Sequence, residues 1–185
     1  MPIRPLEISD IPRWTELRAR LWPHESLGEL DVEGRAALTA EPPLVVFVAE
    51  ENRTLVGFLE LGLRSVAEGC TSSPVPYVEG WYVEADWRRR GVGSALMQAA
   101  EEWSRTHGYT ELGSDTEEVN RLSRVAHAAL GFEEVETLVV FRKPLDPRQV
   151  RPQSRTEPYR PEKPPDKATD PVTRSVGPIA HRHQS

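Results

Sequence analysis

The chain has 185 residues, 38% of them hydrophobic, and a formal net charge of −6 at pH 7. This length fits one packed domain and is too short for two domains of ordinary size. The N-terminal stretch lacks the apolar run of a signal peptide, and no window offers the roughly 18 apolar residues of a membrane span. The single cysteine, Cys70, excludes an internal disulfide and a multi-cysteine zinc site. We therefore expect a cytoplasmic protein without a membrane partner.

The composition changes near residue 144. Residues 146–185 contain eight prolines and no hydrophobic pattern of period 2 or 3.6, so they cannot bury enough apolar surface to offset their ordering entropy. We expect a domain at 1–145 followed by a disordered, Pro-rich tail. His181 and His183 in this tail are weak metal ligands at most, and we expect no metal.

The predicted domain is strongly acidic. The tail has eight Lys/Arg and five Asp/Glu, which leaves 15 basic and 24 acidic side chains in residues 1–145, a formal charge of −9. A field of this sign repels nucleic acid and favours cationic small molecules or basic peptides. We therefore expect a polycationic amine as ligand and no nucleic-acid partner.

The first half of the domain predicts a helix, a hairpin and a strand. A helix begins after the cap residue Ser9 or Asp10 and ends before Pro23; its apolar positions are Ile11, Trp14, Leu17 and Leu21. The runs 44–50 and 55–64 are rich in β-forming residues and flank the polar turn "ENRT", which indicates a hairpin. The run "YVEGWYVE" predicts a further strand.

The second half predicts two helices between strands. The first of these helices ends at Gly108 and places Val92, Ala95, Leu96, Ala99 and Trp103 on one face. After a short strand, "TELGSD", the next helix ends at Gly131 and places Leu122, Val125, Ala126 and Ala129 on one face. "FEEVETLVVFRKPL" predicts one long strand or a bent pair that closes the fold. This order predicts an α/β (α+β) fold, a mixed and mostly antiparallel sheet flanked by helices.

Between the central strand and the helix that follows lies "WRRRGVGSAL", residues 87–96. A turn here presents unpaired backbone N–H groups at the positive end of a helix dipole, and its glycines let an anion come close. Its arginines can pair with further phosphate oxygens. The spacing fits neither a nucleotide P-loop nor a dinucleotide fingerprint. A solvated basic helix start remains the alternative.

The pattern Arg-x-x-Gly-x-Gly at 88–93, with "WYVEADW" before it and "NRLSRVAHAALGF" about thirty residues after it, resembles the GNAT superfamily of acyl-CoA-dependent N-acetyltransferases. The resemblance covers about residues 3–143. "LWP", "TSSPVPYVEGWYV", "SD" at 114–115 and "AHAALGF" are similar to the bacterial aminoglycoside 6'-N-acetyltransferases.

The resemblance implies an acetyl-CoA site. The loop would hold the pyrophosphate, the backbone at Tyr82 and Val83 would pair with pantetheine, and the Val83 N–H would polarise the thioester carbonyl. Asn120 matches an asparagine that contacts pantetheine. His127 stands where many relatives carry a tyrosine proposed to protonate the CoA thiolate; it could do so, bind CoA or simply pack. The implied acetyl-CoA contacts are Tyr82, Val83, Arg88, Arg89, Arg90, Gly91, Val92, Gly93, Ser94, Asn120 and His127.

An acceptor amine is protonated at neutral pH and must lose a proton before it attacks. Asp115 follows a strand at the edge where α/β ligands bind, and the resemblance makes it the expected base. Cap formation by Asp115 and solvated strand faces for the glutamates remain the alternatives. Glu79 in the central strand is a second candidate catalytic carboxylate. The implied acceptor-binding residues are Trp22, His24, Glu25, Glu79, Asp115 and Glu136.

These patterns together predict an acetyl-CoA-dependent enzyme that acetylates the 6'-amino group of aminoglycosides by direct transfer in a ternary complex. The resemblance also implies a homodimer. Two alternatives stay open: an N-acetyltransferase for a polyamine or a protein amine, and a non-catalytic acyl-CoA-binding regulatory module. The carboxylates on the amine side argue against the second.

Overall fold

The computed structural model describes residues 1–144, so the predicted tail at 146–185 lies outside the described residues. The described elements are β1 (Ile3–Pro5), η1 (Ile8–Asp10), α1 (Ile11–Leu21), α2 (Leu27–Leu38), β2 (Val45–Glu51), β3 (Thr54–Arg64), β4 (Val75–Val83), η2 (Ala85–Trp87), α3 (Val92–Thr106), β5 (Gly113–Ser114) and α4 (Arg121–Ala129). None of the described helices is long and apolar enough to span a membrane.

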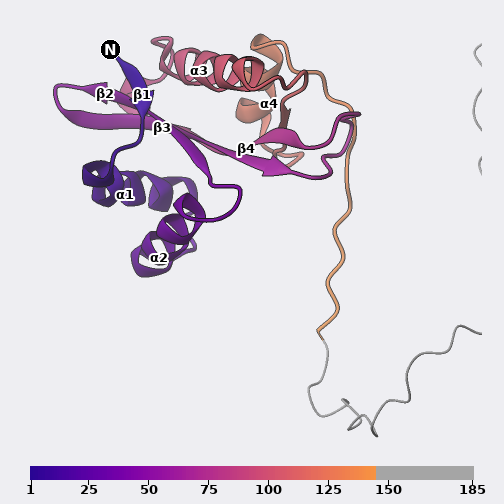
Figure 1. The fold of residues 1–185 in the computed structure, drawn as a ribbon, viewed down its shortest axis with the longest axis horizontal. Coiled ribbons are helices and arrows are strands. Elements are labelled where there is room, and N and C mark those ends of the chain that lie inside the picture. The colour runs from indigo at the N-terminus through magenta and orange to yellow at the C-terminus, as the bar shows by residue number, and fades with distance from the viewer. Residues whose placement is uncertain (145–185) are drawn as a thin grey trace, which may run out of the picture. The chain divides into compact units, whose positions relative to one another are not determined.

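The strands form one sheet in the order β1-β2-β3-β4-β5. The first four pair antiparallel, whereas β4 and β5 are parallel and meet only at Tyr77–Gly113 and Val78–Ser114. Figure 1 shows α1 and α2 on one face of the sheet and α3 and α4 on the other. The predicted fold class, a mixed and mostly antiparallel sheet flanked by helices, is confirmed.

The predicted hairpin is β2–β3. Its turn residues Asn52 and Arg53 have φ values of 49° and 63°, and two consecutive positive values are typical of the type I′ turn that matches the twist of the strands. Asparagine adopts this region at low cost because its short polar side chain can bond locally. The turn "ENRT" therefore fixes the register between β2 and β3.

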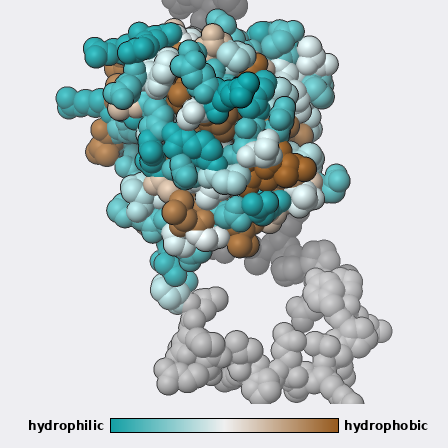
Figure 2. Space-filling view, turned by 90° about the vertical axis from the view of Figure 1, so that its left-hand side faces the viewer, coloured by the Kyte–Doolittle hydropathy of each residue, from teal (hydrophilic) through white to brown (hydrophobic). Residues whose placement is uncertain are grey.

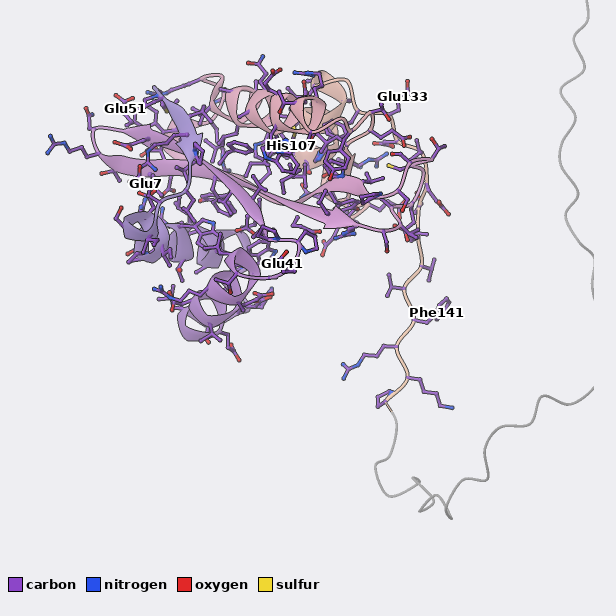
Figure 3. All side chains as sticks on the ribbon, in the orientation of Figure 1. Glu7, Glu41, Glu51, His107, Glu133 and Phe141 are labelled. Atoms are coloured by element: carbon purple, nitrogen blue, oxygen red, sulfur yellow. The ribbon has the colours of Figure 1, made fainter. Side chains whose placement is uncertain are left out.

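Two apolar clusters hold the helices to the sheet, and Figure 3 shows side chains filling the space on both faces. On one face Trp14 and Leu17 of α1 pack on Phe58 of β3. On the other face Leu96 and Met97 of α3 pack on the opposite side of the sheet. The predicted apolar faces of these two helices are thus confirmed.

The structure adds two elements that the sequence analysis does not predict, β1 and α2. Helix α2 has an N-terminal signal: Ser26 Oγ accepts a hydrogen bond from the Glu29 N–H, and the Glu29 carboxylate accepts one from the Ser26 N–H. This Ser-x-x-Glu capping box is readable from sequence. The helix was missed because its apolar residues do not share one face: Leu30 is buried, whereas Leu27 and Val32 are mostly exposed.

The closing strand predicted at 132–145 is absent from the described residues, where 132–144 form no strand. Leu138 and Val139 are 55% and 76% exposed. The prediction rested on apolar and β-branched composition, but a strand also requires a neighbouring strand for its backbone bonds. Helix α4 forms as predicted, yet Leu122 and Val125 on its apolar face are also mostly exposed.

Charged side chains dominate one end of the domain. Figure 2 shows a mostly hydrophilic face there, with separate hydrophobic patches. The Arg4 guanidinium binds both Asp10 and Glu50, and hydrogen bonding from Arg4 lowers the pKa of Asp10. Asp10 is the N-cap residue of α1, one of the two predicted, but its side chain bonds Arg4 and the Glu7 N–H and makes no bond to the first turn of α1.

Glu111 ties the loop between β3 and β4 to the segment before β5. Its carboxylate accepts backbone hydrogen bonds from Thr71 at 3.0 Å and from Ser72 at 2.6 Å. These bonds from Ser72 and Thr71 lower the pKa of Glu111 to about 2. The loop is thus held by charge-assisted bonds to an ionised carboxylate.

Replacing Glu111 by Gln is expected to lower the midpoint of thermal unfolding at neutral pH, because the amide accepts these bonds less strongly. A lowered pKa in the folded state means that the benefit is present above about pH 4.5 and is lost as pH falls toward 2. Melts of both proteins between pH 7 and 3 should therefore converge at the acid end. A constant difference in midpoint would contradict this account.

Candidate functional site

Strand β4 carries a bulge at the centre of the site. Glu60 pairs with Gly80 and Leu61 with Val78, so Glu79 is the extra residue on β4. A bulge re-aims the side chains around it. Here Glu79 lies over Gly62 and Trp22 lies over Gly80, on the face covered by α1 and α2. The bulge therefore directs the Glu79 carboxylate to the acceptor side of the sheet.

Below this surface lies a buried ion pair between α1 and β3. Arg18 Nε is 3.0 Å from Glu60 Oε1, and their side chains are 5% and 2% exposed. Arg18 also donates to the Leu30 carbonyl at 2.6 Å, and its guanidinium lies 5.0 Å from the ring centroids of Trp14 and Trp22. Arg18 thus joins both helices to the sheet and fixes Trp22.

A cleft of about 480 Å³ opens above this pair. Its volume falls in the range of small-molecule sites. Trp22 of the α1 end supplies an aromatic wall, and four carboxylates face one buried arginine; the charged residues lining the cleft are Arg18, Glu25, Glu33, Glu60 and Glu79. An acidic cleft with an aromatic wall suits a sugar that carries ammonium groups.

A chain of contacts leads from this cleft to Asp115. Arg64 binds both oxygens of Glu79, and its guanidinium lies 3.5 Å from the ring centroid of Tyr77. The Tyr77 hydroxyl donates to Asp115 Oδ1 at 2.8 Å. Burial, then the bond to Asp115, raises the pKa of Tyr77, so the phenol stays a donor. Asp115 lies after β5 and does not line the cleft itself.

The predicted anion-binding loop is formed at the start of α3. Gly91 is the residue before the helix and has φ 81°, a conformation that favours glycine. No side chain caps the first turn of α3, so its N–H groups are open to a ligand. Arg88, Arg89 and Arg90 are exposed beside it. A pyrophosphate fits this arrangement of N–H groups and guanidinium groups.

The loop is positioned by its own arginines. Arg88 Nε donates to the Val83 carbonyl at 2.9 Å, and Arg90 lies over the Trp87 ring. On the far side, Gly93 packs closely on Trp81: a Cβ there would lie 2.8 Å from the indole. The start of α3 therefore sits directly on β4.

The end of β4 has free backbone groups on one side. The Glu84 N–H donates to the Val56 carbonyl at 2.9 Å, and residues alternate along an antiparallel ladder. The N–H and C=O of Val83 therefore point away from β3, whereas those of Tyr82 point toward it. Since β5 pairs only with Tyr77 and Val78 and the Val83 carbonyl accepts from Arg88, the open groups are the backbone of Trp81 and the N–H of Val83. The backbone of Tyr82, where a pantetheine contact is predicted, thus faces β3, and its neighbour Trp81 faces the free edge.

His127 of α4 is held in one orientation. Its Nδ1 lies 2.9 Å from the Ser123 carbonyl, which can only accept, so Nδ1 carries a proton. The Nε2 of the neutral ring then accepts from the Ser114 hydroxyl at 2.9 Å. The rings of Trp81 and Phe132 pack edge-on against it. At the start of the same helix, Asn120 Oδ1 accepts the Ser123 N–H, which leaves its NH₂ group for a ligand.

The structure does not bring every predicted residue together. His24 is exposed and does not line the cleft, and Glu136 lies exposed beyond α4. Glu136 has no hydrogen bond to another side chain in the described chain, although its neighbour Val135 lies against Gly69. The predicted cluster of Trp22, Glu25 and Glu79 does form around the cleft.

Sequence reasoning missed five residues of the cleft and of the contacts that lead to Asp115: Arg18, Glu33, Glu60, Arg64 and Tyr77. Glu60 had a signal, because a carboxylate inside the apolar run "LVGFLELGLR" is rarely buried without a partner. The helical spacing of Arg18 among apolar neighbours was the matching signal. Arg64 and Tyr77 join the site only through strand register, which no local pattern specifies.

Residues 11–132 match the model of the acetyltransferase (GNAT) family. The chain is 42% identical over 146 residues to an aminoglycoside N(6')-acetyltransferase type 1 from Klebsiella aerogenes, covering 77% of this chain and 96% of that protein.

Two solved structures are also similar to this chain. The structure of AAC(6')-Iy in complex with the bisubstrate analogue CoA-S-monomethyl-acetylneamine is 34% identical with a TM-score of 0.73, covering 78% of this chain and 98% of that one. The apo structure of AAC(6')-IG, from Acinetobacter haemolyticus, is 33% identical to this chain with a TM-score of 0.74. The match covers 79% of this chain and 100% of that one.

The buried Glu60 predicts a pH-dependent stability. Burial raises the pKa of Glu60 to about 7 against the attraction of Arg18. The folded protein therefore keeps a proton that the unfolded chain loses near pH 4.5, and stability falls as pH rises through this window. From about pH 5.5 to 8 the wild type should lose about 2 kcal/mol relative to Glu60→Gln. Urea unfolding of both proteins measures this, and a pH-independent difference would sink the assignment.

Proposed function

Because the chain belongs to the acetyltransferase (GNAT) family, we propose that it uses the site above to transfer the acetyl group of acetyl-CoA to the 6'-amino group of an aminoglycoside. The observation that carries the proposal is the acidic cleft at Trp22 and Glu79 on one face of β4, with the open anion loop at the end of the same strand. The relatives named above are aminoglycoside N(6')-acetyltransferases. This chain is an acyltransferase with the same activity.

Acetyl-CoA is the proposed cosubstrate. The first-turn N–H groups of α3 and the arginines 88–90 bind its pyrophosphate, and the open backbone at Trp81 and Val83 continues the ladder of β4 with the pantetheine amides. The Asn120 NH₂ group adds a donor at the start of α4. The Val83 N–H then meets the thioester oxygen, where negative charge develops during attack.

The acceptor amine needs a base, and Asp115 is the proposed one. Asp115 takes one ammonium proton directly or through a water, and the nitrogen lone pair then attacks the thioester carbonyl. The C–S bond breaks, CoA leaves as a thiolate, and the nitrogen of the new amide loses its second proton to water. One Asp115 oxygen accepts from Tyr77, which leaves the other free to face the amine. Glu79 and Glu25 bind further ammonium groups, and Trp22 stacks on the sugar.

His127 is the proposed source of the proton for the CoA thiolate. In the neutral form its Nε2 accepts from Ser114, so only the protonated ring can donate. The Ser114 hydroxyl then gives its own proton to the sulfur and receives the proton of His127 Nε2 in its place. His24 and Glu136, predicted as acceptor-binding residues, stand apart from the cleft and carry no role in this proposal.

A matched pair of acceptors tests the function. Neomycin has an amino group at the 6' position where paromomycin has a hydroxyl, so CoA release should be rapid with neomycin and near background at this position with paromomycin. Asp115→Ala should lower kcat by about 100-fold, the scale of a lost general base, with acetyl-CoA binding unchanged. Thiol release with purified protein measures both.

The same assay separates the alternatives. Turnover only with spermidine or a basic peptide would keep the N-acetyltransferase and discard the aminoglycoside. Binding of acetyl-CoA without turnover on any amine would favour a non-catalytic acyl-CoA-binding module. Equal rates with neomycin and paromomycin would contradict acetylation at the 6' position.

We propose that the protein is a homodimer joined through the apolar side chains of α4. Leu122 and Val125 are 70% and 68% exposed on this helix, and Val119 before it is 81% exposed. Exposed apolar groups gathered in this way mark an interaction surface. Light scattering should give twice the mass of one chain, and Leu122→Asp with Val125→Asp should give a monomer. A monomeric wild type would overturn the proposal.

A further inference from the structure

Arg64 covers the groups that the proposed acceptor site would use. Its Nε and Nη2 donate to the two oxygens of Glu79 at 2.9 Å and 2.5 Å. The same guanidinium lies over Tyr77, 3.5 Å from the ring centroid, and Tyr77 donates to Asp115. The Arg64 guanidinium therefore binds the Glu79 carboxylate of the cleft and also covers Tyr77, the residue that donates to the proposed base, Asp115.

This contact has the chemistry of a bound ammonium group. A cation paired with a carboxylate and stacked on an aromatic face is what an aminosugar would offer to the same two residues. Glu79 cannot serve a substrate ammonium with both oxygens while Arg64 holds them. Substrate binding at Glu79 and the Arg64–Glu79 pair are therefore in competition.

The pair is weak enough to be displaced. The side chains of Arg64 and Glu79 are 38% and 31% exposed, and ion pairs with this access to water contribute little. Arg64 is the last residue of β3, where its side chain can turn outward. Glu79 instead lies inside β4, at its bulge, where the strand on either side holds its backbone. Arg64 is the partner that moves.

We propose that Arg64 is a specificity-determining residue that takes the place of a substrate ammonium on Glu79 and yields it only to an acceptor with several ammonium groups. This inference rests on the proposed function. An acceptor with one ammonium group exchanges one ion pair for another and gains little. A polycation also reaches Glu25 in the same cleft, so its binding outweighs the lost pair.

Steady-state kinetics of Arg64→Gln test the proposal. The variant frees Glu79, so KM for neomycin should fall about fivefold, the scale of one exposed bidentate pair, while kcat and acetyl-CoA binding stay near wild type. Arg105→Gln is the control, because Arg105 pairs with Glu101 and Glu102 on the exposed surface of α3. It should behave as wild type.

A double-mutant cycle identifies the route. If Arg64 acts by occupying Glu79, Arg64→Gln should improve neomycin binding in the wild type and leave it unchanged in Glu79→Gln. Calorimetry provides this readout without turnover. A KM that is unchanged or raised in Arg64→Gln overturns the inference, since Arg64 would then only orient Glu79.

Failure of the proposed function and failure of the inference about Arg64 give different results. If the wild type acetylates no aminoglycoside, the proposed function has failed, and the neomycin affinities from calorimetry still decide the role of Arg64. If the wild type turns over but Arg64→Gln binds neomycin no more tightly, the function stands and the inference about Arg64 is wrong.

Discussion

The site depends on the short contact between β4 and β5. Only two residue pairs join these strands, so the strand that crosses the centre of the molecule has one edge free for the rest of its length. Backbone groups at a free edge need partners. In a β-sheet that continued across this edge, Trp81 and Val83 would bond a neighbouring strand and would be closed to a ligand. The separation of β5 from β4 is thus what turns a structural strand into a binding surface.

The same strand brings the two halves of the reaction together. Its bulge directs Glu79 to the face under α1 and α2, and four residues later Val83 points its amide toward the free edge. A strand rises about 3.3 Å per residue, so the acceptor carboxylate and the proposed oxyanion donor are about 13 Å apart along one rigid element. The buried Arg18–Glu60 pair then fixes the helices that close the acceptor side.

Local patterns predicted the elements well where periodicity and turn chemistry agree. The anion loop followed from glycine spacing and from its place before a helix, and the hairpin from the polar turn at 51–54. The bulge at Glu79 was not predictable, because it is set by pairing with β3 and no residue of β4 signals it. The same pairing of β3 with β4 places Arg64 and Tyr77 in the site. The strand predicted at 132–145 does not form over the described residues 132–144. The composition of this segment favours a strand, but composition supplies no hydrogen-bonding partner.

The glycines of the cleft floor limit how this protein can evolve a new range of substrates. A side chain at Gly62 would collide with Glu79, and one at Gly80 would collide with Trp22, both at 2.8 Å. Single substitutions on the floor would therefore displace the groups that hold the sugar before they could reshape the space around it. Glu25, at the rim before α2, has no such constraint because it is exposed. Adaptation to antibiotics with altered amino groups should accordingly accumulate in the segments around α2, while the sheet beneath keeps its residues.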